Sequence, residues 1–138
     1  MCIRDKSLLE LTGSFLNSTL AFLTVELGGR ANLGEGVLDF KVYEAEEIIV
    51  PNPQLFKGKT KDDVLQAFDE LSKRPIKPIF EEVKMKDRQR LDRLVLKALG
   101  VDPKQDLKPI YDGLTELVRE RIELANMRKK VKQVKSQR

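Results

Sequence analysis

The sequence predicts a mainly α protein, a small helical bundle with a minor β strand or hairpin near residues 37–42. Two observations lead to this fold class. Apolar residues recur every three or four positions through much of the 138 residues, which is the spacing of helices with one buried face. Apolar and polar residues alternate at 37–42, as in a half-buried strand. Because aromatic residues are only 6% of the chain, we expect a core of Leu, Ile and Val.

The first helical segment spans residues 7–27, and its leucines follow helical spacing. Thr12, Gly13 and Ser14 are a candidate break, so we expect the helix to begin at about Ser14. Gly28 stands where a left-handed C-cap belongs. Small and polar side chains form a stripe that favours close helix packing over a ligand site; they are Ser14, Asn17, Ser18 and Ala21.

Residues 11–25 carry no charge, which raises the question of a membrane span. Fifteen residues fall short of the roughly 20 that a spanning helix needs, and Glu10 and Glu26 close the run. We therefore expect a buried core helix, no membrane partner and no signal peptide.

Residues 26–40 contain four glycines, which suggests either a phosphate-binding loop or turns. A Walker loop needs Lys followed by Ser or Thr after its last glycine, but Glu35 follows Gly34 and Val37 follows Gly36. The dinucleotide motif fails too, because these glycines follow a helix and precede a strand. The glycines therefore predict turns, followed by a strand with Leu38, Phe40 and Val42 facing the core.

The remainder of the chain predicts short helices separated by prolines. We expect a helical turn at 43–49, a proline exit at 51–53, a helix opened by a capping box at 60–63, a break at 74–78 and a turn at 79–83. A helix capped by Asp87 should run to Leu99 and end at Gly100. The last helix should begin near Asp106 and enter the basic tail, with Arg121 interrupting its apolar stripe.

The net charge of +4 is unevenly distributed. Residues 127–138 carry six Lys and Arg and no acid, so the other 126 residues hold 20 bases and 22 acids. A basic tail is therefore indicated, and a basic surface over the whole fold is not.

The residue types exclude several kinds of chemistry. There is no His and only one cysteine, Cys2, so zinc sites of Cys and His and triads with a His base are excluded. We expect no catalytic residue, no metal site and no cofactor, and a single cysteine fits a cytoplasmic location.

Several segments together resemble the carboxyl-terminal part of adenine-specific DNA methyltransferases of type II and type IIG restriction-modification systems. The segments that carry the resemblance are 16–53 (LNSTLAFLTVELGGRANLGEGVLDFKVYEAEEIIVPNP), 74–83 (RPIKPIFEEV), 87–100 (DRQRLDRLVLKALG) and 106–125 (DLKPIYDGLTELVRERIELA). The resemblance implies that 16–18 begin a recognition-region helix, that Gly29 and Arg30 form a turn, and that 51–53 form the exit. Ile49 departs from the pattern, because such exits often have a proline there.

The resemblance also shows what this sequence lacks. These enzymes bind S-adenosylmethionine through a Gly-rich loop and grip a flipped adenine with an Asn-Pro-Pro-Tyr or Asp-Pro-Pro-Tyr motif, and neither is present here. We therefore expect a non-catalytic DNA-recognition and assembly segment, with residues 1–56 ending a recognition-type region, 57–126 helical and 127–138 a basic tail. A methyltransferase catalytic chain and double-stranded DNA are the implied partners.

The expected DNA contacts are Lys, Arg and Asn side chains that could meet phosphates. They are Arg30, Asn32, Lys57, Lys59, Lys61, Arg128, Lys129, Lys130 and Lys132. Arg30 could equally pair with Glu26 or Glu35, and the lysines at 57–61 could be a solvated loop. The alternative function is a helical protein–protein interaction module without DNA contact, built on the stripe from Leu107 to Leu124.

The strand at 37–42 would lack most of the region with which it normally pairs. An unpaired strand leaves open edges, so we expect it to pair with a second copy in a homodimer or to pack on helices as a small hairpin.

Overall fold

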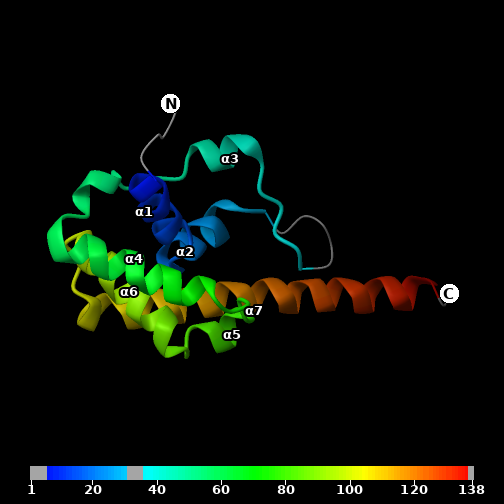
Figure 1. Ribbon diagram of the computed structural model, residues 1–138. Coiled ribbons are helices and arrows are strands. Elements are labelled where there is room, and N and C mark those ends of the chain that lie inside the picture. Colours follow the sequence, from blue (N-terminus) through cyan, green and yellow to red (C-terminus); the bar gives the residue numbers. More distant parts are fainter. Residues whose placement is uncertain (1–5, 31–35, 137–138) are drawn as a thin grey trace.

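A computed structural model describes residues 6–30 and 36–136. In these residues the chain is a mainly α bundle, which confirms the predicted fold class (Figure 1). Its elements are α1 (Lys6–Leu16), α2 (Thr19–Gly28), α3 (Val42–Glu46), the 3-10 turn η1 (Pro53–Leu55), α4 (Gly58–Ser72), α5 (Ile79–Glu82), α6 (Lys86–Ala98) and α7 (Pro103–Ser136).

The core forms where α1, α4 and α6 pack together, with α2 and α6 against α7. Its buried apolar residues are Leu11, Phe15, Ala21, Phe56, Val64, Ala67, Leu71, Leu91 and Val95. These side chains come from four helices and from Phe56 beside η1, so the first 56 residues and the following helices share one apolar cluster. Most of its members are aliphatic, as the composition predicts.

The break in the first helical segment lies at Asn17 and Ser18, and not at residues 12–14 as predicted. The Asn17 side chain donates to the Gly13 carbonyl at 2.9 Å, which closes α1. Ser18 then accepts from the Ala21 N–H and begins α2 as its N-cap. The helix continues through Gly13. It stops where two side chains that bond the backbone, Asn17 and Ser18, follow one another.

The glycine-rich turn also differs from its prediction. Gly28 belongs to α2, and the C-cap is Gly29 in an extended conformation, with φ −80°, so no left-handed cap forms there. Residues 37–42 form no strand: a single antiparallel bridge joins Arg30 and Asp39. Val42 begins α3 and is 78% exposed, so it does not face the core.

The chain around this bridge packs on helices, as the hairpin alternative predicted, but the described residues form a single bridge and no hairpin of strands. A Cβ at Gly29 would overlap the Leu38 side chain, and one at Gly36 would approach Ala125 of α7. The described residues contain no strand whose edge could pair with a second copy, and the homodimer itself stays a prediction.

The starts of three helices differ from the predicted caps. α4 begins at Gly58 after Lys57, without a side-chain cap from Thr60. α6 begins after Met85, because the Asp87 carboxylate binds Arg74 and lies within the first turn. α7 begins at Pro103, where Asp102 accepts the Lys104 N–H at 3.0 Å and proline suits the first helical position.

Candidate nucleic-acid interface

A buried polar network fixes α6 against α2 and α7. Asp92 of α6 accepts the Thr19 N–H at 2.8 Å, the Thr19 hydroxyl at 2.5 Å and the Tyr111 hydroxyl at 2.7 Å. Burial raises the pKa of Asp92, while the hydrogen bonds to its oxygens oppose that rise. Burial and the neighbouring Asp92 also raise the pKa of Tyr111. The hydrogen bond from its hydroxyl to Asp92 holds the Tyr111 ring in one orientation on α7.

Arg88 anchors the break between α1 and α2. Its side chain is fully buried, and it donates to Glu82 at 3.1 Å and to the Asn17 carbonyl. Its guanidinium also lies 5.2 Å from the centre of the Phe22 ring. Glu82, itself fully buried, accepts from Arg74 as well. Two arginines thus compensate one buried carboxylate, as a charge in the interior requires.

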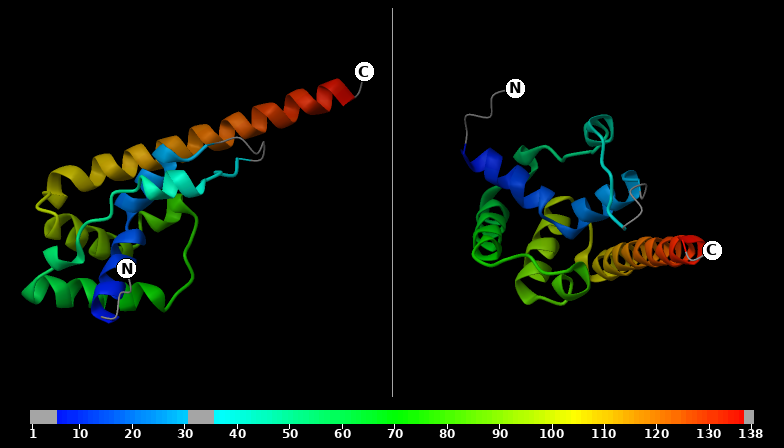
Figure 2. Two further views of the ribbon diagram at one scale, coloured as in Figure 1. Left: turned by 90° about the horizontal axis from the view of Figure 1, so that it is seen from above. Right: turned by 90° about the vertical axis from the view of Figure 1, so that its right-hand side faces the viewer.

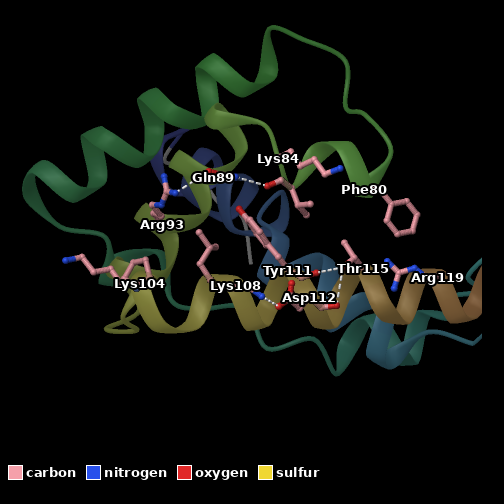
Figure 3. Close-up of a pocket in the computed structure, with 13 residues that line it drawn as sticks. Phe80, Lys84, Gln89, Arg93, Lys104, Lys108, Tyr111, Asp112, Thr115 and Arg119 are labelled. Carbon is pink, nitrogen blue, oxygen red and sulfur yellow. Dashed lines mark hydrogen bonds and ion pairs between the residues drawn. The ribbon is translucent and has the colours of Figure 1, made fainter.

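A groove lies between α7 and the wall formed by α5, α6 and their connection (Figure 3). Its volume is about 710 Å³. Apolar side chains line part of it, namely Phe80, Val83, Pro103, Leu107 and Tyr111. Its charged lining residues are Lys84, Arg93, Lys104, Lys108, Arg119 and Asp112. Five cations therefore surround the groove against one carboxylate, so it favours an anionic ligand.

The groove cations differ in their partners. Lys108 pairs with Asp112 at 2.5 Å, and Arg119 pairs with Glu116 while its guanidinium lies 5.9 Å from the Phe80 ring centre. Arg93 bonds Gln89 at 3.2 Å. Within the described residues, no acid is placed in an ion pair with Lys84, Arg93 or Lys104.

The second basic feature is the C-terminal part of α7. Arg121 holds the helix to the bundle through Glu26 at 2.6 Å and through the Gly36 carbonyl, and Ala125 is the last buried side chain described. From there the helix extends beyond the other elements, as Figures 1 and 2 both show. We call residues 126–136 the projecting helix. It carries the predicted contacts Arg128, Lys129, Lys130 and Lys132.

The other predicted contact residues do not join this surface. Lys57 and Lys59 are exposed at the start of α4, where Lys61 donates to Ser7 at 3.0 Å. Figure 1 places this end of α4 opposite the C-terminus. Arg30 pairs with Glu44 at 2.7 Å and lies 5.5 Å from the Tyr43 ring centre. Asn32 lies outside the described residues, as does the Lys132 side chain.

The groove was not predicted from the sequence, although one signal for it is present there. Lys104, Lys108 and Arg119 lie on one face of a helix at spacings of four and eleven residues. Lys84 and Arg93 come from another part of the chain, and only the fold brings them opposite that face. Among the described residues, no three Cys, Asp or Glu side chains gather where they could hold a metal ion.

No single described helix is long and apolar enough to span a membrane. Among the described helices, α1 and α2 meet the length and hydropathy of a span only when they are taken together, and the chain bends by 62° between them. No protein-family model matches the chain, and no curated protein or solved structure matches it either.

Proposed function

We propose that this chain is a non-catalytic DNA-binding and assembly segment, and that the projecting helix contacts the phosphates of duplex DNA. One observation carries this proposal: the chain concentrates its positive charge on a helix that leaves the bundle. Phosphate contacts by Lys and Arg supply most of the non-specific affinity of proteins for DNA, and they need no pocket.

The energetics of the projecting helix support a polyanion as its partner. A helix without tertiary packing is marginal in water, and like charges three or four residues apart destabilise it further, as at Arg128 and Lys132. Binding to phosphates would remove this repulsion. The resemblance to the ends of DNA methyltransferases supports the same partner and adds a catalytic chain as the assembly partner.

The test is a titration of a fluorescently labelled 16-base-pair duplex at several salt concentrations between 50 and 200 mM. The variant changes Arg128, Lys129, Lys130 and Lys132 to Gln. Each lost phosphate contact should reduce the slope of log affinity against log salt by about 0.9, so we expect a reduction of roughly 3 to 4. Absent or salt-insensitive binding by the unchanged protein would overturn the proposal.

A matched control removes a similar charge elsewhere. Lys6, Lys41 and Lys73 are exposed and each pairs with an acid at the surface. Changing these three lysines to Gln should leave the salt slope within about one unit of the unchanged protein, because none of them lies on α7.

The alternative function, a protein–protein interaction module, was predicted on the stripe from Leu107 to Leu124. Leu107 and Leu114 are buried in the bundle and are not available to a partner, so the exposed apolar residues of α7 lie further along the helix. Leu124, Met127 and Val131 are 52%, 59% and 55% exposed and follow the three–four spacing of a helix-pairing stripe. Changing Leu124 and Val131 to Gln should leave duplex binding intact under the DNA proposal. Under the alternative, the unchanged protein would show no duplex binding, and the same change would abolish a complex seen by light scattering.

A further inference from the structure

The groove is elongated. Along α7 it runs from Pro103 to Arg119, which is about 24 Å at 1.5 Å per residue. A groove of this length can contact several successive units of an extended chain, whereas a small ligand would occupy only part of it.

The charges indicate an extended polyanion. Lys84 and Arg93 lie on one wall, and Lys104, Lys108 and Arg119 lie on the other. In Figure 3, Lys104 stands at one end of the groove and Arg119 at the other, so the cations follow its whole length. A chain with a charge on every unit would meet a cation at each step, whereas a single small anion would use only one or two of them.

The aromatic residues distinguish nucleic acid from an acidic peptide. Phe80 is partly exposed at the same end as Arg119, and Tyr111 lines the groove with its hydroxyl anchored on Asp92. A cationic groove with fixed aromatic rings matches the way proteins bind single strands, whose bases stack on the rings while the phosphates meet Lys and Arg. An acidic peptide would use the cations but not the rings.

We infer that this groove binds a short single strand of nucleic acid, about four nucleotides long. This site is separate from the duplex contacts proposed for the projecting helix, because none of its lining residues lies beyond Arg119. Each of the two proposals can therefore fail without the other.

The experiment measures fluorescence anisotropy of a labelled eight-nucleotide thymidine strand with the full chain. The groove variant changes Lys84, Arg93 and Lys104 to Gln, the three cations that no described acid pairs with. We expect its affinity for the strand to fall at least tenfold and its salt slope to fall by about two units. The control variant at Lys6, Lys41 and Lys73 should stay within about threefold. The variant of the projecting helix should lose duplex binding and retain most strand binding.

A second variant tests the aromatic contact. Phe80→Leu should lower strand affinity about tenfold, and Phe80→Tyr should retain it, because the tyrosine ring can still stack. Circular dichroism melting of each variant shows whether it is folded. If Phe80→Leu does not fold, the groove variant provides the test. Strand binding that neither the groove variant nor Phe80→Leu weakens would overturn the inference. Displacement of the strand by a peptide of ten glutamates at equal or lower concentration, with no effect of Phe80→Leu, would assign the groove to acidic peptides instead.

Discussion

Thr19 and Asp92, 73 positions apart in the sequence, are joined by two hydrogen bonds, from the Thr19 N–H at 2.8 Å and from its hydroxyl at 2.5 Å. The carboxylate thereby satisfies an N–H in the first turn of α2, one of the four that a helix leaves without an internal partner. The same carboxylate accepts from Tyr111, so one buried side chain of α6 connects α2 with α7.

Asp92→Asn should therefore be strongly destabilising. The amide keeps one acceptor oxygen, but its N–H₂ group faces the hydroxyls of Thr19 and Tyr111. These hydroxyls can accept from the N–H₂ group, but their own O–H groups then lose the buried acceptor that the carboxylate supplied. We expect a loss of about 2 to 3 kcal/mol in the free energy of unfolding, measured by urea denaturation. Asp69→Asn is the control, because the exposed pair of Asp69 with Lys73 should contribute less than about 1 kcal/mol. Equal effects of the two changes would contradict this account.

The stability of the fold should fall in acid because of Asp87. Its hydrogen bonds with Arg74 hold the pKa of Asp87 at about 2, below the ordinary value of 3.8. Burial opposes ionisation of Glu82, but hydrogen bonds from Arg74, the Lys77 N–H and Arg88 hold the pKa of this carboxyl below its usual range too. For carboxyl groups with a lowered pKa in the folded state, the stabilisation is complete above the unfolded pKa and is lost as the pH falls through the folded pKa.

The corresponding measurement compares urea midpoints of the unchanged protein and Asp87→Asn at pH 7, 4 and 2.5. At pH 7 the variant should be less stable by on the order of 1 kcal/mol. This free energy is smaller than the whole pKa shift of Asp87 would give, because its side chain is partly exposed and solvent screens its pair with Arg74. The two proteins should converge as the pH falls towards 2. A difference that stays constant with pH would show that the charge of Asp87 does not contribute.

Arg121 and Glu26 should be strongly coupled in stability. Their side chains are 17% and 8% exposed and share two hydrogen bonds, which hold α7 to α2. Arg121→Met should cost roughly 3 kcal/mol, because it leaves the Glu26 carboxylate buried without its cation. The double variant with Glu26→Gln should cost less than the sum of the two single changes. A double-mutant cycle measures this coupling, and additive effects would contradict it.

The parts of the fold that follow from local pattern could be predicted from the sequence. The helical class, the helical turns at 43–49 and 79–83 and the end of α6 at Gly100 all depend on apolar spacing or on proline and glycine, which act on their own neighbourhood. The predicted cap at Asp87 was wrong because its carboxylate binds Arg74, thirteen residues away. Local propensity cannot show whether a carboxylate accepts hydrogen bonds from the N–H groups of its own helix or from a side chain in another segment.

Residues whose role depends on distant parts of the chain could not be predicted. Arg121 interrupts an apolar stripe in the sequence, yet it lies between α7 and α2 because Glu26 is there to pair with it. Arg88 is similarly a residue type that is mostly exposed, but it is fully buried on the same face of α6 as Leu91 and Val95. The candidate groove was missed for the same reason, since its two walls come from separate parts of the chain. The basic tail was predictable because its charge density is visible in the sequence itself.

Two glycines should respond to alanine in opposite directions. Gly113 lies inside α7, and a Cβ there would meet nothing within 4 Å. Gly113→Ala should therefore stabilise the protein by about 0.5 to 1 kcal/mol, the difference in helix propensity. Gly100 also has open space around it, but its φ of +77° is one that L-residues rarely adopt. Gly100→Ala should therefore destabilise by about 1 kcal/mol, through backbone strain alone. Thermal unfolding of both variants gives the comparison. Destabilisation by Gly113→Ala would contradict the propensity argument, and stabilisation by Gly100→Ala would contradict the strain argument.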